Sequence, residues 1–217
     1  YGPHLVLRLI LCGGSNVPRH LLSTAYERLP NTLTSVIWGM TEGIGSSCWP
    51  QDPPERVIGT DGKAFLGTEL DILGPDGEHL SHDVEGELIM RGPQRFLGYF
   101  GRPELDDEVF LPDGWLRTGD VASMDAEGYL KISGRSKEII IRGGANISPA
   151  EVETALSSDP RIRRIAVVAI ADKRLGERLC ACIVPVEPSA SPSLDDVKNL
   201  AERAALAKYK LAERVQI

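Results

Sequence analysis

Residues 114–153 combine charged side chains with glycine loops, a combination suited to binding a ligand. Thr118-Gly119-Asp120 predicts a tight turn that carries an acid. A short hairpin then leads to Gly134-Arg135-Ser136-Lys137 and to the glycine loop Arg142-Gly143-Gly144-Ala145-Asn146. The pattern before this stretch predicts barrel and sheet, and the pattern after it predicts a small separate α+β module. Because ligand sites favour seams between domains, we expect these charged groups to bind a ligand.

Two further glycine loops follow predicted strands near the start of the chain. The near-continuous apolar run over residues 5–12 is typical of a strand buried on both faces, and it ends in Gly13-Gly14-Ser15-Asn16. Pro18 then opens a helix, and a second strand over residues 34–37 ends in Trp38-Gly39-Met40-Thr41-Glu42-Gly43. Ligands bind at the carboxyl ends of strands in open α/β sheets, although each loop by itself is also typical of a plain turn.

Composition excludes several classes of protein. The chain has 217 residues and a net charge of -7, and it has no basic block of the kind that binds nucleic acid. No apolar run is long enough to span a membrane, and the first residues show no signal-peptide pattern. The four cysteines lack zinc-ligand spacing, which favours reduced, buried thiols. We therefore expect a cytoplasmic protein.

The periodicity predicts an α/β and α+β fold in two parts. Residues 1–55 form an α/β piece and residues 56–136 a barrel-like subdomain, because short β-rich runs at 69–73, 86–90 and 129–132 alternate with turn signals. Residues 137–217 form the second, smaller part.

The smaller part has its own sequence of strands and helices. Ser148-Pro149-Ala150-Glu151 predicts a capping box, so a helix begins there, and Ser193 caps a second helix. Strands are predicted over residues 139–141, 164–171, 179–186 and 215–217.

Taken together, five segments resemble the ANL superfamily of adenylate-forming enzymes, which includes acyl-CoA synthetases. They are Gly13-Gly14-Ser15; Trp38-Gly39-Met40-Thr41-Glu42; Gly86-Glu87-Leu88 with Arg91-Gly92 and Gly98-Tyr99; residues 115–120; and residues 134–151. Each motif alone is weak, but the five in order make a specific signal that spans nearly the whole chain. The resemblance implies the end of a large domain followed by a small mobile domain. It also implies a two-step reaction: a carboxylate attacks ATP to give an acyl-adenylate and pyrophosphate, and a thiol, usually CoA, then displaces AMP.

The resemblance implies catalytic roles for Thr41 and Glu42 and a ribose-binding role for Asp120. The hydroxyl of Thr41 can bond a phosphate oxygen, and Glu42 supplies one carboxylate to Mg²⁺ on the nucleotide. The two oxygens of Asp120 suit the two adjacent ribose hydroxyls of AMP. Arg135 stays charged and, by resemblance, contacts ribose or phosphate.

Other matched residues surround the nucleoside and the acyl group. The residues with implied nucleotide contacts are Gly14, Ser15, Trp38, Gly39, Met40, Thr41, Asp120, Ile132 and Arg135. Trp38 stands where the family stacks an aromatic ring on adenine. Ile132 is either an apolar wall beside the nucleoside or plain strand core. Gly39 stands where acetate-specific relatives carry a tryptophan, so we expect an acid larger than acetate.

The resemblance also assigns the hinge residue between the two domains and the loop that contacts the thiol acceptor. Lys137 matches the hinge about which the small domain rotates between the two half-reactions. Arg142, Gly143 and Gly144 match the loop that lines the pantetheine tunnel, where glycine permits passage.

Two parts of the family's machinery fall outside these 217 residues. The phosphate loop is expected upstream, and the catalytic lysine shortly past Ile217, so the fragment alone is expected to be inactive. Two alternatives stay open: an enzyme that loads an aryl or amino acid onto a carrier protein, and a non-catalytic AMP-binding fragment. The acid substrate and the oligomeric state cannot be read from the sequence.

Overall fold

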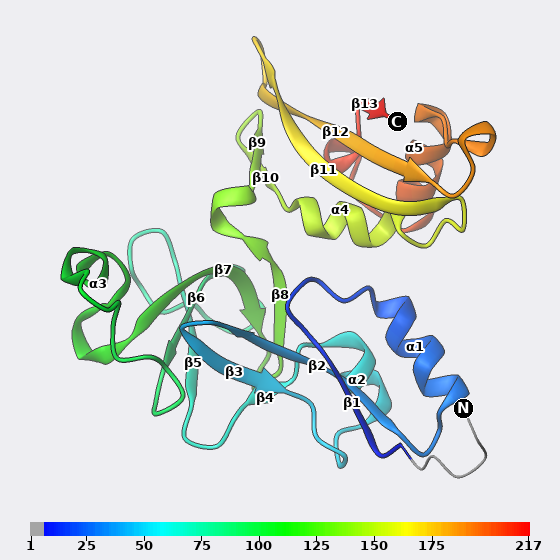
Figure 1. The fold of residues 1–217 in the computed structure, drawn as a ribbon. Coiled ribbons are helices and arrows are strands. Elements are labelled where there is room, and N and C mark those ends of the chain that lie inside the picture. The colour runs from blue at the N-terminus through cyan, green and yellow to red at the C-terminus, as the bar shows by residue number, and fades with distance from the viewer. Residues whose placement is uncertain (1–6) are drawn as a thin grey trace. The chain divides into compact units, whose positions relative to one another are not determined.

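The computed structural model describes residues 7–217 and divides into two compact units (Figure 1). The division falls between Ile132 and Ser133, whereas the sequence placed the boundary between residues 136 and 137. The unit boundary therefore lies inside strand β8 (Leu130–Arg135), ahead of the predicted hinge.

The first unit begins with a mixed four-stranded sheet in the order β1-β2-β3-β4. Its strands are β1 (Leu9–Cys12), β2 (Leu33–Met40), β3 (Gly43–Ser47) and β4 (Lys63–Ala64). β1 runs parallel to β2, as expected across an α/β crossover, whereas β2, β3 and β4 pair antiparallel. Helices α1 (Arg19–Arg28) and α2 (Pro54–Gly59) pack against β2 and bury Leu22 and Val57.

The prediction that the first strand is buried on both faces is wrong for the described residues. Leu9 and Leu11 are each 48% exposed, because β1 is the edge strand of its sheet. Leu5 and Val6, where the predicted strand begins, lie outside the described residues.

A second four-stranded sheet, in the order β5-β6-β7-β8, supplies most of the buried residues in the hydrophobic core of the first unit. Its other strands are β5 (Glu69–Leu73), β6 (Gly86–Arg91) and β7 (Leu116–Met124), with helix α3 (Pro103–Val109) and the short 3-10 turn Pro112–Gly114 between β6 and β7. Leu88, Met90 and Leu130 are fully buried, and Trp38 of the first sheet belongs to the same core.

Asp61 and Gly62, just before β4, link β8 at the edge of the second sheet to the first sheet. A barrel-like subdomain requires a link of this kind. Asp61 N donates to Leu130 O and Leu130 N donates to Gly62 O, each at 2.8 Å. A Cβ on Gly62 would lie 1.9 Å from the carbonyl carbon of Ser47, and its φ is +81°, so only glycine fits there.

The second unit is an α+β body with one sheet and two helices. The sheet runs β10-β9-β12-β11, and β13 pairs with β12. Its strands are β9 (Ile140–Arg142), β10 (Ala145–Ile147), β11 (Ile162–Asp172), β12 (Gly176–Pro185) and β13 (Arg214–Gln216). The helices are α4 (Pro149–Leu156) and α5 (Leu194–Arg203), with 3-10 turns at Ser136–Glu138, Pro188–Ala190 and Lys208–Lys210. Val152, Leu156 and Val197 pack with the apolar face of β11 and β12 to form its core.

Both helices begin at the serines that the sequence indicated. Ser193 and Asp196 form a reciprocal capping box, in which each side chain accepts from the other's backbone N–H. Ser148 Oγ accepts from Glu151 N at 3.3 Å, but the carboxylate of Glu151 accepts from Lys210 Nζ at 2.6 and 2.7 Å. Glu151 thus ties α4 to the Lys208–Lys210 turn.

Candidate active site

A buried hydrogen bond joins two of the sequence motifs in the first unit. Trp38 Nε1 donates to Asp120 Oδ2 at 2.8 Å, and the two side chains are 8% and 5% exposed. The indole also packs on Gly45, where a Cβ would lie 2.0 Å from a ring carbon. The Trp38 ring is therefore held in the core with one edge on the predicted ribose-binding carboxylate, and adenine stacking on it stays a prediction.

Thr118-Gly119-Asp120 lies inside strand β7 and is not the tight turn that the sequence predicted. The register between β6 and β7 shifts at this point, so extra residues of β7 lie opposite Leu88, and Thr118 Oγ1 donates to Leu88 O at 2.7 Å. Gly119 has φ +70°, a left-handed conformation that favours glycine. Because a bulge redirects side chains, this one sets the direction of Asp120.

Thr41 and Glu42 are the two residues of the hairpin turn between β2 and β3, since Met40 pairs with Gly43. Thr41 is exposed and Glu42 half-buried. Glu42 Oε1 accepts from the Tyr99 hydroxyl at 2.8 Å, and this hydrogen bond is the main reason that the pKa of Tyr99 is raised. Tyr99 therefore stays a neutral donor and orients the carboxylate. The Gly98-Tyr99 segment thus supports the Thr-Glu motif.

The residues around Glu42 fit a magnesium ion that a nucleotide carries, and not a cage made by protein alone. Among residues 7–217 no group of three or more His, Cys, Asp or Glu side chains could hold a metal. One carboxylate beside the exposed hydroxyl of Thr41 matches the few protein ligands that Mg²⁺ needs when phosphates and water supply the others.

Glycine is needed in the two loops for different structural reasons. A Cβ on Gly13 would lie 2.6 Å from Ile37 O, so glycine at this position lets the loop after β1 approach β2. Gly14 has φ +82° and precedes the exposed Ser15. A Cβ on Gly39 would lie 3.0 Å from Gly43 O, so the β2–β3 hairpin itself favours glycine there. The role of Gly39 in an acyl pocket stays a prediction.

The structure places a partly buried ion pair beside Ile132 that sequence reasoning missed. Asp61 Oδ2 accepts from Ile132 N and from Arg19 Nη2, each at 2.8 Å, and Asp61 is 6% exposed. Ile132 itself packs against the core of the second sheet, as the strand-core alternative predicts, and its contact with the nucleoside stays a prediction. Arg19 begins α1, four residues after Ser15. The pair therefore connects the helix after one predicted nucleotide loop to the strand that carries Ile132; no local pattern indicated it.

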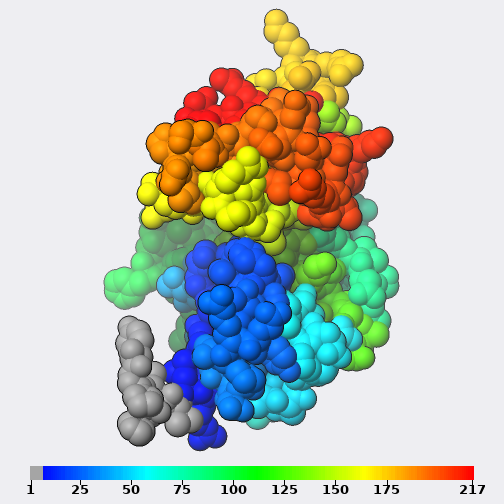
Figure 2. Space-filling view, turned by 90° about the vertical axis from the view of Figure 1, so that its right-hand side faces the viewer, coloured from blue at the N-terminus to red at the C-terminus, as the bar shows by residue number. Residues whose placement is uncertain are grey.

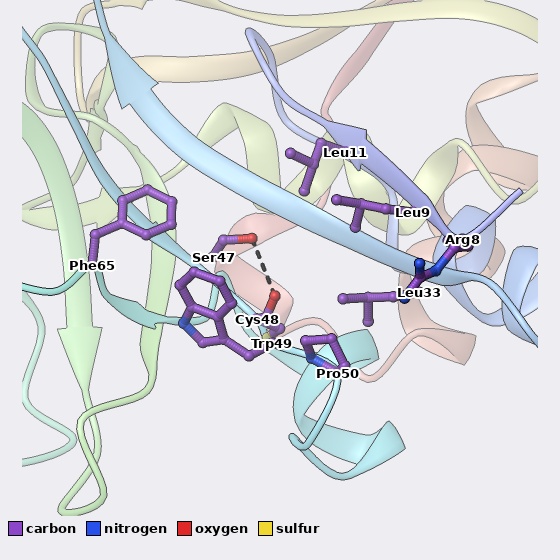
Figure 3. Close-up of a pocket in the computed structure, with 9 residues that line it drawn as sticks. All are labelled: Arg8, Leu9, Leu11, Leu33, Ser47, Cys48, Trp49, Pro50 and Phe65. Carbon is purple, nitrogen blue, oxygen red and sulfur yellow. Dashed lines mark hydrogen bonds between the residues drawn. The ribbon is translucent and has the colours of Figure 1, made fainter.

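An apolar pocket of about 380 Å³ lies on the exposed face of the first sheet (Figure 3). Leu9, Leu11 and Leu33 line one side, and Trp49 and Phe65, in edge-to-face contact, line the other. None of the residues predicted to bind nucleotide or CoA lines this pocket.

In the second unit the predicted CoA loop is a tight β-hairpin turn. Gly143 and Gly144, with φ of +58° and +86°, connect β9 to β10. Arg142 donates to Glu213 from Nε and Nη2 at 3.2 and 3.0 Å, and this pairing raises its pKa and lowers that of Glu213. The guanidinium of Arg142 is therefore engaged within the unit. Lys137 is exposed in the Ser136–Glu138 turn, and Arg135 is exposed at the end of β8.

Comparison with known proteins agrees with the motifs. The family model for AMP-binding enzymes matches residues 3–100, and the model for the AMP-binding enzyme C-terminal domain matches residues 151–217. The chain belongs to the adenylate-forming superfamily. It is 40% identical over 212 residues to the medium-chain fatty-acid–CoA ligase of Escherichia coli K12, and 38% identical over 208 residues to a salicylyl-CoA synthase / salicylate adenylyltransferase of a Streptomyces species.

The fold is also that of the adenylate-forming enzymes. The structure of o-succinylbenzoate CoA synthetase from Bacillus subtilis in complex with its acyl-adenylate intermediate superposes with a TM-score of 0.86 at 32% identity, covering 96% of this chain and 42% of that one. The two curated relatives are matched over 97% and 95% of this chain but over 37% of their own length in each case. Within residues 7–217, no helix has the length and apolar character needed to cross a membrane.

Proposed function

We propose that the protein containing this chain is an AMP-forming acyl-CoA synthetase. It activates a carboxylic acid larger than acetate with ATP and transfers the acyl group to CoA. The observation that carries the proposal is the Trp38–Asp120 hydrogen bond, because it brings together two family motifs that lie far apart in the sequence. The names of the relatives, a fatty-acid–CoA ligase and a salicylyl-CoA synthase among them, support the same reaction class.

In the first half-reaction, residues of the first unit bind and orient the nucleotide. Asp120, held by Trp38, accepts from the ribose hydroxyls, and Ile132 with the loop at Gly14 and Ser15 lies beside the nucleoside. Thr41 donates to a phosphate oxygen, and Glu42, oriented by Tyr99, binds Mg²⁺. Mg²⁺ supplies neutralisation of the phosphate charge that develops as pyrophosphate departs. Gly39 supports an acid larger than acetate, since glycine has no side chain that would narrow the acyl pocket.

In the second half-reaction, the second unit presents a different surface. Lys137 is the hinge, and its exposed position in a short turn between two strands supports that role. The Gly143-Gly144 turn lines the path of the pantetheine arm, and Arg135 contacts the ribose or phosphate. A carboxylate, ATP and CoA are then the substrates.

A second candidate function is loading of an aryl or amino acid onto a carrier protein. One relative is named both a salicylyl-CoA synthase and a salicylate adenylyltransferase, so likeness to it supports the adenylation step without naming one thiol acceptor. A non-catalytic AMP-binding protein is the third candidate. The four cysteines are all free thiols, which supports a reducing compartment such as the cytoplasm.

The test is acid-dependent pyrophosphate release by the full-length protein over a panel of carboxylic acids, followed by detection of acyl-CoA by mass spectrometry. We expect release with one acid class and a CoA thioester of that acid. Glu42→Gln is the control, and we expect it to lose pyrophosphate release by roughly 10² or more, as for other groups that stabilise transition-state charge. Acid-dependent release without any CoA thioester would favour the carrier-loading enzyme. No release with any acid would favour the AMP-binding protein.

A further inference from the structure

One segment of the first unit, residues 95–99, holds both the backbone and the side chain of Glu42. Phe96 N donates to Glu42 O at 2.6 Å, and Arg95 forms an antiparallel bridge with Gly43, the residue after Glu42. The hydroxyl of Tyr99 donates to Glu42 Oε1 at 2.8 Å, whereas Glu42 Oε2 accepts no hydrogen bond from residues 7–217. The segment therefore fixes one carboxylate oxygen and leaves the other for a ligand.

Helix α3 in turn holds this segment at Tyr99. Asp106, which lies in α3, accepts from Tyr99 N through Oδ1 at 2.8 Å. A Cβ on Gly98 would lie 2.6 Å from Asp106 Oδ2, so glycine at this position lets the carboxylate approach the backbone. Because a carboxylate accepts a stronger hydrogen bond than a neutral oxygen does, Asp106 anchors the backbone of Tyr99.

Aromatic rings connect the end of α3 to the same segment. The rings of Phe96 and Tyr99 meet edge to face with their centroids 4.8 Å apart. Phe96 also stacks on Phe110, the residue that follows α3, at 5.4 Å. These contacts restrict rotation of the Tyr99 side chain and keep its hydroxyl on Glu42.

α3 contributes little to the core of the first unit. None of its residues is fully buried, although Val109 in its last turn packs against the core, whereas α1 and α2 bury Leu22 and Val57. Figure 1 shows α3 at the end of the first unit away from α1 and α2, the helices that face the viewer in blue and cyan in Figure 2. Asp106 therefore contacts Tyr99 without filling the core.

We propose that Asp106 is a positioning residue for the magnesium-binding carboxylate of Glu42 and that it acts through Tyr99. The inference rests on the proposed function, in which Glu42 binds the Mg²⁺ that the nucleotide carries. Asp106 places the backbone of Tyr99, the Tyr99 hydroxyl holds Oε1 of Glu42, and Oε2 is left for the metal. Hydrogen-bond partners that orient a metal ligand contribute to metal affinity although they do not touch the ion.

The experiment measures ATP binding to the full-length enzyme by calorimetry, without acid, in the presence of either Mg²⁺ or EDTA. We expect Mg²⁺ to tighten ATP binding to the wild type, and the ratio of the two dissociation constants is the readout. Tyr99→Phe is expected to lower this ratio by about tenfold, the smaller end of the losses typical for partners of a metal ligand. Asp106→Ala is expected to lower it by about threefold, because the hydroxyl remains and only its placement changes.

Two further variants show whether the effect comes from the hydrogen bond. Asp106→Asn keeps an acceptor oxygen for Tyr99 N, so we expect the wild-type ratio. Asp107→Ala removes the same charge from the next position of α3, where the side chain is exposed, and should also leave the ratio unchanged. ATP affinity in EDTA is expected to stay at the wild-type value in every variant, because the rest of the nucleotide site is intact.

A double-mutant cycle separates this inference from the proposed function. In a Glu42→Gln background, which lacks the metal-binding carboxylate, adding Asp106→Ala should lower the ratio no further. An unchanged ratio in Asp106→Ala, an equal loss in Asp106→Asn or Asp107→Ala, or a further loss in the Glu42→Gln background would overturn the inference and leave the proposed function standing. A wild-type ratio in Glu42→Gln would overturn the magnesium role of Glu42 and the inference together.

Discussion

Trp38 and Asp120 lie 82 positions apart in the chain and share a buried hydrogen bond of 2.8 Å. A residue expected to meet adenine thus holds the residue expected to meet ribose. The pair has a structural role as well as a proposed ligand role, because a buried indole N–H that lost its acceptor would destabilise the fold.

The first prediction separates those two roles at Asp120. Asp120→Ala removes the acceptor of Trp38, so we expect the free energy of unfolding to fall by about 1–3 kcal/mol. Asp120→Asn keeps an acceptor oxygen but removes the charge, so we expect a smaller loss of stability. In the full-length enzyme both variants should weaken AMP binding, because the charge-assisted bonds to ribose are lost.

Urea unfolding of each variant and calorimetry with AMP give the two measurements. Wild-type AMP affinity in Asp120→Asn would exclude the ribose-binding role, whatever its stability.

The second prediction concerns the ion pair of Arg19 and Asp61. Asp61→Ala leaves Ile132 N and Arg19 Nη2 without their acceptor, whereas Arg19 Nη1 still donates to Thr60 O. We expect the free energy of unfolding to fall by about 1–3 kcal/mol. The side chain of Arg19 is 28% exposed, which keeps this loss below the cost of breaking a fully buried pair. Asp61→Asn retains the acceptor for Ile132 N and should lose less.

A double-mutant cycle of Arg19→Met and Asp61→Asn, followed by urea unfolding, isolates the coupling between the two side chains. We expect the losses to be clearly less than additive, since each single variant already breaks the pair. Additive losses would show that the two side chains contribute independently.

The third prediction tests Lys137 as the hinge. Proline fixes φ near -65°, so Lys137→Pro in the full-length enzyme should restrict rotation of the second unit. We expect it to form acyl-adenylate from acid and ATP, while transfer from preformed adenylate to CoA falls by orders of magnitude. Lys137→Ala removes the charge but leaves φ free, and should lose far less of the second step. Equal loss of both half-reactions in the two variants, measured in single turnovers, would mean that the ammonium group matters and the hinge does not.

The fourth prediction is a pH dependence that originates at Glu153 in α4. Its Oε1 accepts from Val167 N at 2.7 Å, and burial, with a smaller contribution from the charge of Glu138, raises its pKa. The folded state therefore holds this proton more tightly than the unfolded state does. Its contribution to stability is fully present below the ordinary glutamate pKa of about 4.3 and is lost as the pH rises through the raised value.

Glu153→Gln keeps an acceptor for Val167 N and does not titrate. We expect the variant to gain stability relative to the wild type as the pH rises from about 4 to about 7, across the ordinary glutamate pKa. Urea midpoints at several pH values measure the difference, and a difference that does not change with pH would show that Glu153 titrates alike in both states.

Local patterns in the sequence determined much of the second unit. Ser148 and Ser193 begin their helices because an N-cap bonds to a backbone N–H only three residues away, so the signal and the contact lie in the same few residues. The order of the five motifs likewise indicated the family without any coordinates, since it depends on residue types along the chain.

The tertiary structure alone decided how the motifs are held. Asp120 lies in a bulge and not in a turn because β6 is present opposite it, and β6 comes some 30 residues earlier in the chain. Asp61 meets Ile132, and Gly143 meets Leu175, for the same kind of reason: each contact joins segments that are distant in sequence. Side-chain periodicity reports which face a residue occupies, but it carries no information on which distant segment will cover that face.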